Sequence, residues 1–195
     1  MRNLKVIMWN LPNVLTAFRI LLVPLFVVFF YIDSPVARWI TLGIFCFAAA
    51  TDWLDGFLAR KMNIESPFGA FLDPVADKLM VAITLILLVE REGSLWLAIP
   101  ALVIIGREIT ISALREWMAE VGNRAVVGVS VIGKLKTLSQ MFAIFLFLLA
   151  PPSVFGLPKT FGFVFIWLSA LLTLWSMYSY LKAAWPYLTS SENDA

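Results

Sequence analysis

Four aspartates in the stretch 52–77 are the residues of this chain best suited to do chemistry. Asp52 and Asp55 are three positions apart, and Asp73 and Asp77 are four positions apart. Both spacings place side chains on one face of a helix. Carboxylates held this close together repel one another unless cations lie between them, so the pattern predicts a metal site.

The expected metal is Mg²⁺, because carboxylate oxygens suit a hard cation that also binds substrate phosphates. Four acids can hold two such ions, an arrangement that clamps a diphosphate and neutralises a leaving phosphate. Mn²⁺ is the alternative ion. Arg60 follows the first pair of aspartates and is placed to bind a phosphate oxygen through its guanidinium.

The chain contains no histidine, which excludes Ser-His catalysis, Cys-His catalysis and any histidine-ligated zinc site. A carboxylate is therefore the natural general base for a substrate hydroxyl, and we choose Asp77. A purely structural ion-pair cluster with Arg60, Lys61 and Lys78 is the alternative. It is disfavoured because the acids outnumber their neighbouring cations, and burial without metal would be costly.

The composition places these residues in an integral membrane protein. The chain has 195 residues, of which 61% are hydrophobic and 14% charged, whereas about 25% of a typical soluble domain is charged. The net charge of +2 is too small to suggest a nucleic-acid partner. The single cysteine, Cys46, cannot form an internal disulfide and lies in an apolar run.

Six segments are apolar enough to cross a bilayer, for which about 20 residues are needed. They cover residues 14–31, 36–59, 73–89, 95–114, 132–149 and 160–181. Residues 1–11 mix basic and apolar side chains and predict a short helix lying in the membrane interface. We therefore expect an all-α membrane protein with one domain over residues 1–188 and a polar tail over 189–195.

Basic residues near the span ends predict the orientation. If the spans alternate, most lysines and arginines fall on one side, and only Arg38, Arg91 and Lys159 fall on the other. The positive-inside rule then puts both termini in the cytoplasm. It puts the aspartate cluster at the cytoplasmic ends of the second and third spans, within reach of soluble substrates.

The acidic pattern resembles the signature of the CDP-alcohol phosphotransferase family. It reads Asp52-x-x-Asp55-Gly56-x-x-Ala59-Arg60, eight residues, then Gly69-x-x-x-Asp73-x-x-x-Asp77, with all eight defining positions filled. The resemblance extends over most of the chain. The stretches 10–19, 106–117 and 133–137 resemble the bacterial branch of the family, which makes phosphatidylglycerophosphate.

The resemblance implies a homodimeric enzyme of the bacterial cytoplasmic membrane. It would join sn-glycerol 3-phosphate to CDP-diacylglycerol and release CMP. The metal ligands carried over are Asp52, Asp55, Asp73 and Asp77, of which Asp77 is also the base. The donor-binding residues carried over are Gly56, Ala59, Gly69 and Arg60, the last at a phosphate.

A phosphorylated acceptor needs a basic pocket of its own. The candidates are Arg107, Arg115, Lys134 and Lys136, with Glu108 expected to orient one of the arginines. Contact with lipid headgroups is the alternative for each of them. Arg19 lies inside the first span, where it would form an ion pair or bind a substrate phosphate. Asn13 would line a nucleotide pocket or cap the helix.

Three other functions compete with this interpretation. The same reaction type could use another alcohol, such as serine or inositol phosphate. An intramembrane prenyltransferase also uses aspartates and Mg²⁺ on a diphosphate, but it releases diphosphate and not CMP. A divalent-cation transporter would place acids at mid-membrane depth, whereas these acids gather at one interface, and no internal repeat supports a transporter.

Overall fold

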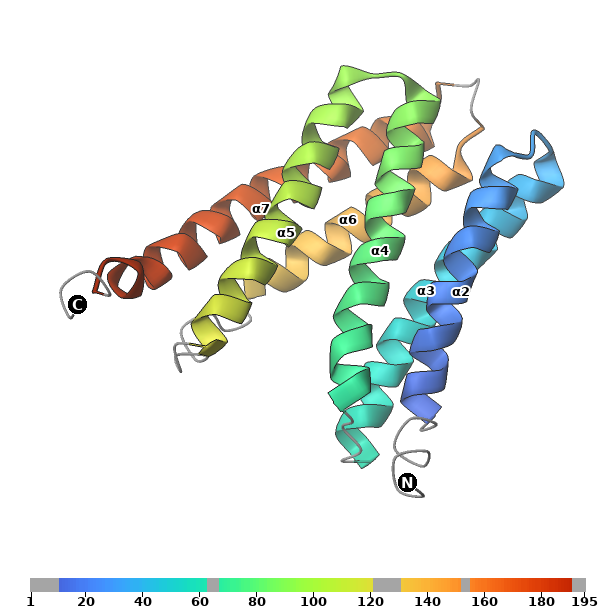
Figure 1. Ribbon diagram of the computed structural model, residues 1–195. Coiled ribbons are helices and arrows are strands. Elements are labelled where there is room, and N and C mark those ends of the chain that lie inside the picture. Colours follow the sequence, from blue (N-terminus) through green and yellow to red (C-terminus); the bar gives the residue numbers. More distant parts are fainter. Residues whose placement is uncertain (1–10, 63–66, 121–130, 152–154, 191–195) are drawn as a thin grey trace. The chain divides into compact units, whose positions relative to one another are not determined.

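The computed structural model describes residues 11–62, 67–120, 131–151 and 155–190. Every secondary-structure element in these ranges is an α-helix (Figure 1). Within this part of the chain there is no strand, as the all-α prediction requires. The helices are α2 (Leu11–Tyr31), α3 (Pro35–Met62), α4 (Pro67–Glu92), α5 (Leu95–Glu120), α6 (Val131–Leu149) and α7 (Leu157–Ser190).

The helices follow the six expected segments but extend beyond several of the expected ends; α5, for example, continues past residue 114 to Glu120. Helix α4 begins at Pro67 and not near Asp73, because a proline fits the first position of a helix, where no N–H donor is needed. Helix α7 continues past residue 181 to Ser190, with Pro186 inside it. The expected interfacial helix falls on residues 1–10, and most of the polar tail on 191–195; both lie outside the described residues.

Tight turns separate α2 from α3 and α4 from α5. The Ser34 hydroxyl accepts a hydrogen bond from the Val36 amide at 3.3 Å, and this caps the start of α3. Between α4 and α5, Gly93 has a φ of +57°, a left-handed conformation that glycine adopts without steric cost. Its amide donates to the Val89 carbonyl at 3.0 Å, which closes the end of α4.

The chain divides into two compact units. The first comprises Met1–Leu88 with Leu148–Pro151, and α2 packs against α3 within it. The second comprises Val89–Phe147 with Pro152–Ala195, and α5 packs against α7 within it. The acidic pattern belongs to the first unit and the basic candidates to the second.

The surfaces of the helices are those of a multi-pass membrane protein. In the described part of the chain, three segments are long and apolar enough to cross a bilayer: Val14–Tyr31, Leu95–Glu120 and Leu157–Tyr187. Large apolar side chains point outward from them, such as Leu21 at 69% and Leu102 at 71% exposed. Cys46 is also exposed, on α3. Apolar surface of this extent is stable in lipid and not in water.

An ion pair is buried at the junction of α4, α6 and α7 in the second unit. The Lys159 ammonium lies 2.7 Å from a carboxylate oxygen of Glu92, and both side chains are less than one-tenth exposed. The neighbouring Arg91 donates a hydrogen bond to the Phe147 carbonyl at 2.7 Å. These contacts provide partners for Arg91 and Lys159, two of the three basic residues that were expected on the side away from the cytoplasm.

Helices α6 and α7 approach closely at Gly162. A Cβ atom at this position would lie 3.1–3.3 Å from atoms of the Phe147 ring, which is fully buried. That ring also packs edge-on against Phe163, with centroids 5.0 Å apart. The ring therefore has little freedom to move away, and the contact needs a residue without a side chain.

Gly162→Leu should lower the stability of the protein by about 1–3 kcal/mol, because the added side chain overpacks the α6–α7 contact. Thermal unfolding of the detergent-solubilised protein measures this change. Gly43→Leu is the matched control, because a Cβ atom there meets nothing within 4 Å. Equal melting temperatures for the two variants would contradict the packing argument.

Candidate active site

The four predicted metal ligands lie on two consecutive helices, at the ends that the chain joins directly. Asp52 and Asp55 lie in the C-terminal part of α3, and Asp73 and Asp77 in the N-terminal part of α4. Only residues 63–66 separate the two helices, so the joined ends are at most about 18 Å apart. The acids therefore belong to the same end of the first unit (Figure 1).

Arg19 binds the first of these acids. Its Nη1 atom donates to Asp52 Oδ1 at 2.9 Å, from α2 to α3. The arginine side chain is 2% exposed, whereas the aspartate side chain is 49% exposed. Of the two roles considered for Arg19, the structure thus contains the ion pair. The contact holds one carboxylate in place while leaving part of it open to a ligand.

The remaining donor-site residues are located by their helices alone, because their side chains fall outside the described part of the structure. Asn13 is on α2, and the others are on α3 and α4: Asp55, Gly56, Ala59, Arg60, Gly69, Asp73 and Asp77. Their roles as metal ligands, base and donor-binding residues therefore stay predictions. A set of oxygen donors without histidine or cysteine fits a hard divalent ion.

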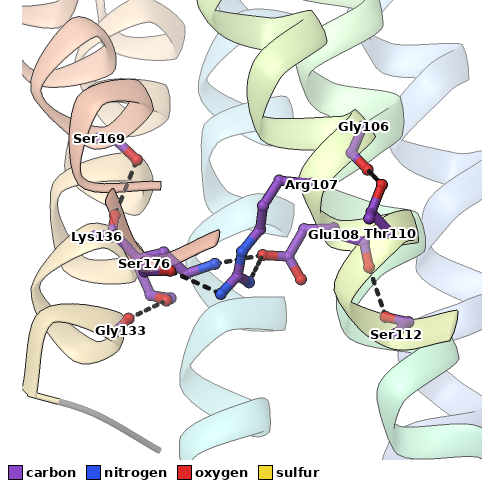
Figure 2. Close-up of polar contacts among 10 residues, drawn as sticks. Gly106, Arg107, Glu108, Thr110, Ser112, Gly133, Lys136, Ser169 and Ser176 are labelled. Atoms are coloured by element: carbon purple, nitrogen blue, oxygen red, sulfur yellow. Dashed lines mark hydrogen bonds and ion pairs between the residues drawn. The ribbon is translucent and has the colours of Figure 1, made fainter. Parts of the chain in front are cut away.

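A basic cluster lies in the second unit, where α5 and α6 each contribute a cation to one carboxylate (Figure 2). Arg107 Nη1 lies 2.9 Å from Glu108 Oε1, and Lys136 Nζ lies 2.5 Å from the same oxygen. The arginine and lysine side chains are 3% and 7% exposed, and the glutamate side chain is 30% exposed. The expectation that Glu108 orients an arginine is confirmed.

Helix α7 completes the surroundings of Arg107. Arg107 Nη2 donates a hydrogen bond to Ser176 Oγ at 2.9 Å, and the Arg107 guanidinium lies 5.5 Å from the centre of the Tyr180 ring. Arg115 reaches the same ring at 5.9 Å. A cation near an aromatic ring is attracted by the electron density of its face. The ring therefore connects two of the four predicted phosphate-binding residues.

Sequence reasoning missed the contribution of α7. The helix carries a row of buried polar residues at helical spacing: Ser169, Thr173, Ser176 and Tyr180. Ser169 also donates to the Lys136 carbonyl at 3.0 Å. Polar residues repeated every three or four positions in an apolar span are a signal that the sequence contained.

The charges of the cluster suit a doubly charged anion. Arg107, Arg115 and Lys136 supply three cations, and Glu108 supplies one carboxylate, so two positive charges stay uncompensated within the cluster. A phosphate monoester carries a matching charge and accepts several charge-assisted hydrogen bonds. Lys134 also belongs to α6, but its side chain lies outside the described residues.

Comparison with known proteins agrees with the acidic pattern. The model of the family described as CDP-alcohol phosphatidyltransferase matches residues 9–175. A relative from Pseudomonas fluorescens is 52% identical over 180 residues, which cover 92% of each chain. Relatives from Salmonella typhimurium and Yersinia pestis are 52% and 51% identical over 176 residues, covering 90% of this chain and 95% of theirs. All three are named CDP-diacylglycerol--glycerol-3-phosphate 3-phosphatidyltransferase.

Ser176→Ala should destabilise the protein by about 1–3 kcal/mol, because it leaves a buried N–H of Arg107 without its acceptor. Thr173→Val is the matched control on the same helix, since the buried Thr173 hydroxyl has no hydrogen-bond partner among the described residues. Thermal unfolding of both variants in detergent tests the prediction. A melting temperature for Ser176→Ala as high as that of Thr173→Val would refute it.

Proposed function

Because the chain belongs to the CDP-alcohol phosphatidyltransferase family, we propose that it transfers the phosphatidyl group of CDP-diacylglycerol to sn-glycerol 3-phosphate. The products are phosphatidylglycerophosphate and CMP. The observation that carries this proposal is 52% identity across 92% of both chains to a relative named for this activity. The basic cluster of the second unit supports it, because it suits an acceptor that is itself a phosphate.

The donor is bound by the first unit in this proposal. Asp52, Asp55, Asp73 and Asp77 would hold two Mg²⁺ ions, which supply charge neutralisation at the diphosphate when bound. Arg60 binds a phosphate oxygen, and Asn13 contributes to the nucleotide pocket. The small residues Gly56, Ala59 and Gly69 leave room for the cytidine end. Arg19 holds the Asp52 carboxylate in place from α2.

Asp77 acts as the base. Its carboxylate takes the proton from a hydroxyl of the acceptor, and the resulting oxygen attacks the phosphorus bonded to diacylglycerol. A new P–O bond forms to the acceptor, and the P–O bond to CMP breaks. For such a transfer the protein supplies mainly positioning and electrostatic stabilisation.

The acceptor phosphate is bound by Arg107, Arg115, Lys134 and Lys136. Ser176 and Tyr180 fix the direction of the Arg107 side chain. Glu108 binds both Arg107 and Lys136 and so keeps the two cations side by side. Arg107 and Lys136 are buried and share one carboxylate, so an acceptor without a phosphate, such as serine, would leave their excess positive charge without a matching group. The charge of the cluster therefore supports a phosphorylated alcohol.

The protein in this proposal is a bacterial cytoplasmic-membrane protein with one membrane domain over residues 1–188. The domain comprises a short interfacial helix followed by six spans. The distribution of lysine and arginine supports a site that faces the cytoplasm. The assembly as a homodimer rests on the resemblance to the family.

The activity is tested with purified protein, CDP-diacylglycerol and Mg²⁺, to which single acceptors are added. We expect sn-glycerol 3-phosphate to give phosphatidylglycerophosphate, identified by mass, together with one CMP per lipid formed. Chelation with EDTA should abolish turnover, and Mg²⁺ should restore it. Release of diphosphate would indicate a prenyltransferase, and product from serine alone would reassign the acceptor.

Asp77→Asn should lower kcat by at least about a hundredfold, because the amide cannot take the hydroxyl proton. Asp33→Asn is the control, since Asp33 is an exposed carboxylate in the turn between α2 and α3. Steady-state CMP release measures both variants. Near-normal turnover of Asp77→Asn would remove Asp77 from the role of base.

A further inference from the structure

Glu108 presents its two carboxylate oxygens to different surroundings. Arg107 and Lys136 both bind Oε1, at 2.9 and 2.5 Å. Figure 2 shows the second oxygen turned away from both cations, and no described residue donates a hydrogen bond to it. With 30% of its side chain exposed, Glu108 is the most accessible member of this trio.

This geometry makes Oε2 a fixed hydrogen-bond acceptor. Two buried cations hold the carboxylate through Oε1, so the direction of Oε2 is set before any ligand binds, and preorganisation of this kind favours specific recognition. A ligand group that fits here must donate a hydrogen bond. An ammonium is disfavoured by the neighbouring cations, which leaves a hydroxyl as the group of matching chemistry.

We propose that Glu108 is a specificity-determining residue whose Oε2 accepts a hydrogen bond from a non-reacting hydroxyl of the acceptor. The inference rests on the proposed function, in which the acceptor phosphate binds the cations beside Glu108. In sn-glycerol 3-phosphate the middle hydroxyl is on the carbon next to the phosphate-bearing one. A phosphate on Arg107 and Lys136 therefore places that hydroxyl within reach of the carboxylate.

A purely structural role for Glu108 predicts a different result. Holding Arg107 and Lys136 in place requires only Oε1, so a structural role predicts no discrimination between acceptors with and without the middle hydroxyl. Recognition through Oε2 requires that the enzyme discriminate against an acceptor without that hydroxyl. The two roles are separated by comparing two acceptors on the same protein.

The test compares sn-glycerol 3-phosphate with 1,3-propanediol monophosphate, which keeps the phosphate and a primary hydroxyl but lacks the middle hydroxyl. We expect kcat/KM of the wild type to be about tenfold or more higher for the first, as for a hydrogen bond to a charged group. In Glu108→Gln, an oxygen still faces the cations and an amide replaces Oε2, so the ratio should fall to about threefold or less.

Ser176→Ala is the matched control, because it disturbs Arg107 without touching Oε2. It should lower kcat/KM for both acceptors and leave their ratio as in the wild type. Equal use of both acceptors by the wild type, or an unchanged ratio in Glu108→Gln, overturns the inference. Failure of the wild type to use sn-glycerol 3-phosphate overturns the proposed function instead. If Glu108→Gln does not fold, Glu108→Asp, whose oxygens are retracted by one methylene, is expected to lower the ratio too.

Discussion

Compensation of charge within a low-dielectric bilayer is the constraint on which the rest of this structure depends. An isolated ion in hydrocarbon is costly, so charges inside spans must meet partners or mark a functional site. Arg19 meets Asp52, Lys159 meets Glu92, and Glu108 meets two cations through one oxygen. These contacts link α2 to α3 in the first unit, and α4, α5, α6 and α7 in the second.

The ionic contacts differ in what they leave uncompensated. The pair formed by Glu92 and Lys159 is deeply buried on both sides and balances its charge, which suits a contact that only joins helices. The cluster around Glu108 has more cations than carboxylates, and the proposed ligand that corrects this imbalance is a phosphate monoester. The joined ends of α3 and α4 carry the four aspartates for which divalent ions and a nucleotide diphosphate are proposed.

Hydropathy predicted the helices well wherever apolar residues reach their ends, as at Tyr31 and Leu149. It failed at α4, where the predicted span begins at Asp73 although residues 67–72 are apolar and the helix begins at Pro67. The types of Arg107 and Lys136 identified them as candidate ligands, because charges inside spans are rare. Ser176 and Tyr180 were missed because hydroxyl groups are common in spans, and only the packing of α7 against α5 gives them a role.

The exposed position of Cys46 has a practical consequence for spectroscopy. It is the single thiol of the chain, and it precedes Asp52 by less than two turns of α3, or about 9 Å along the helix axis. A spin label or fluorophore attached there needs no engineered cysteine. Such a probe sits close enough to the acidic end of the helix for a paramagnetic ion bound there to broaden or quench its signal.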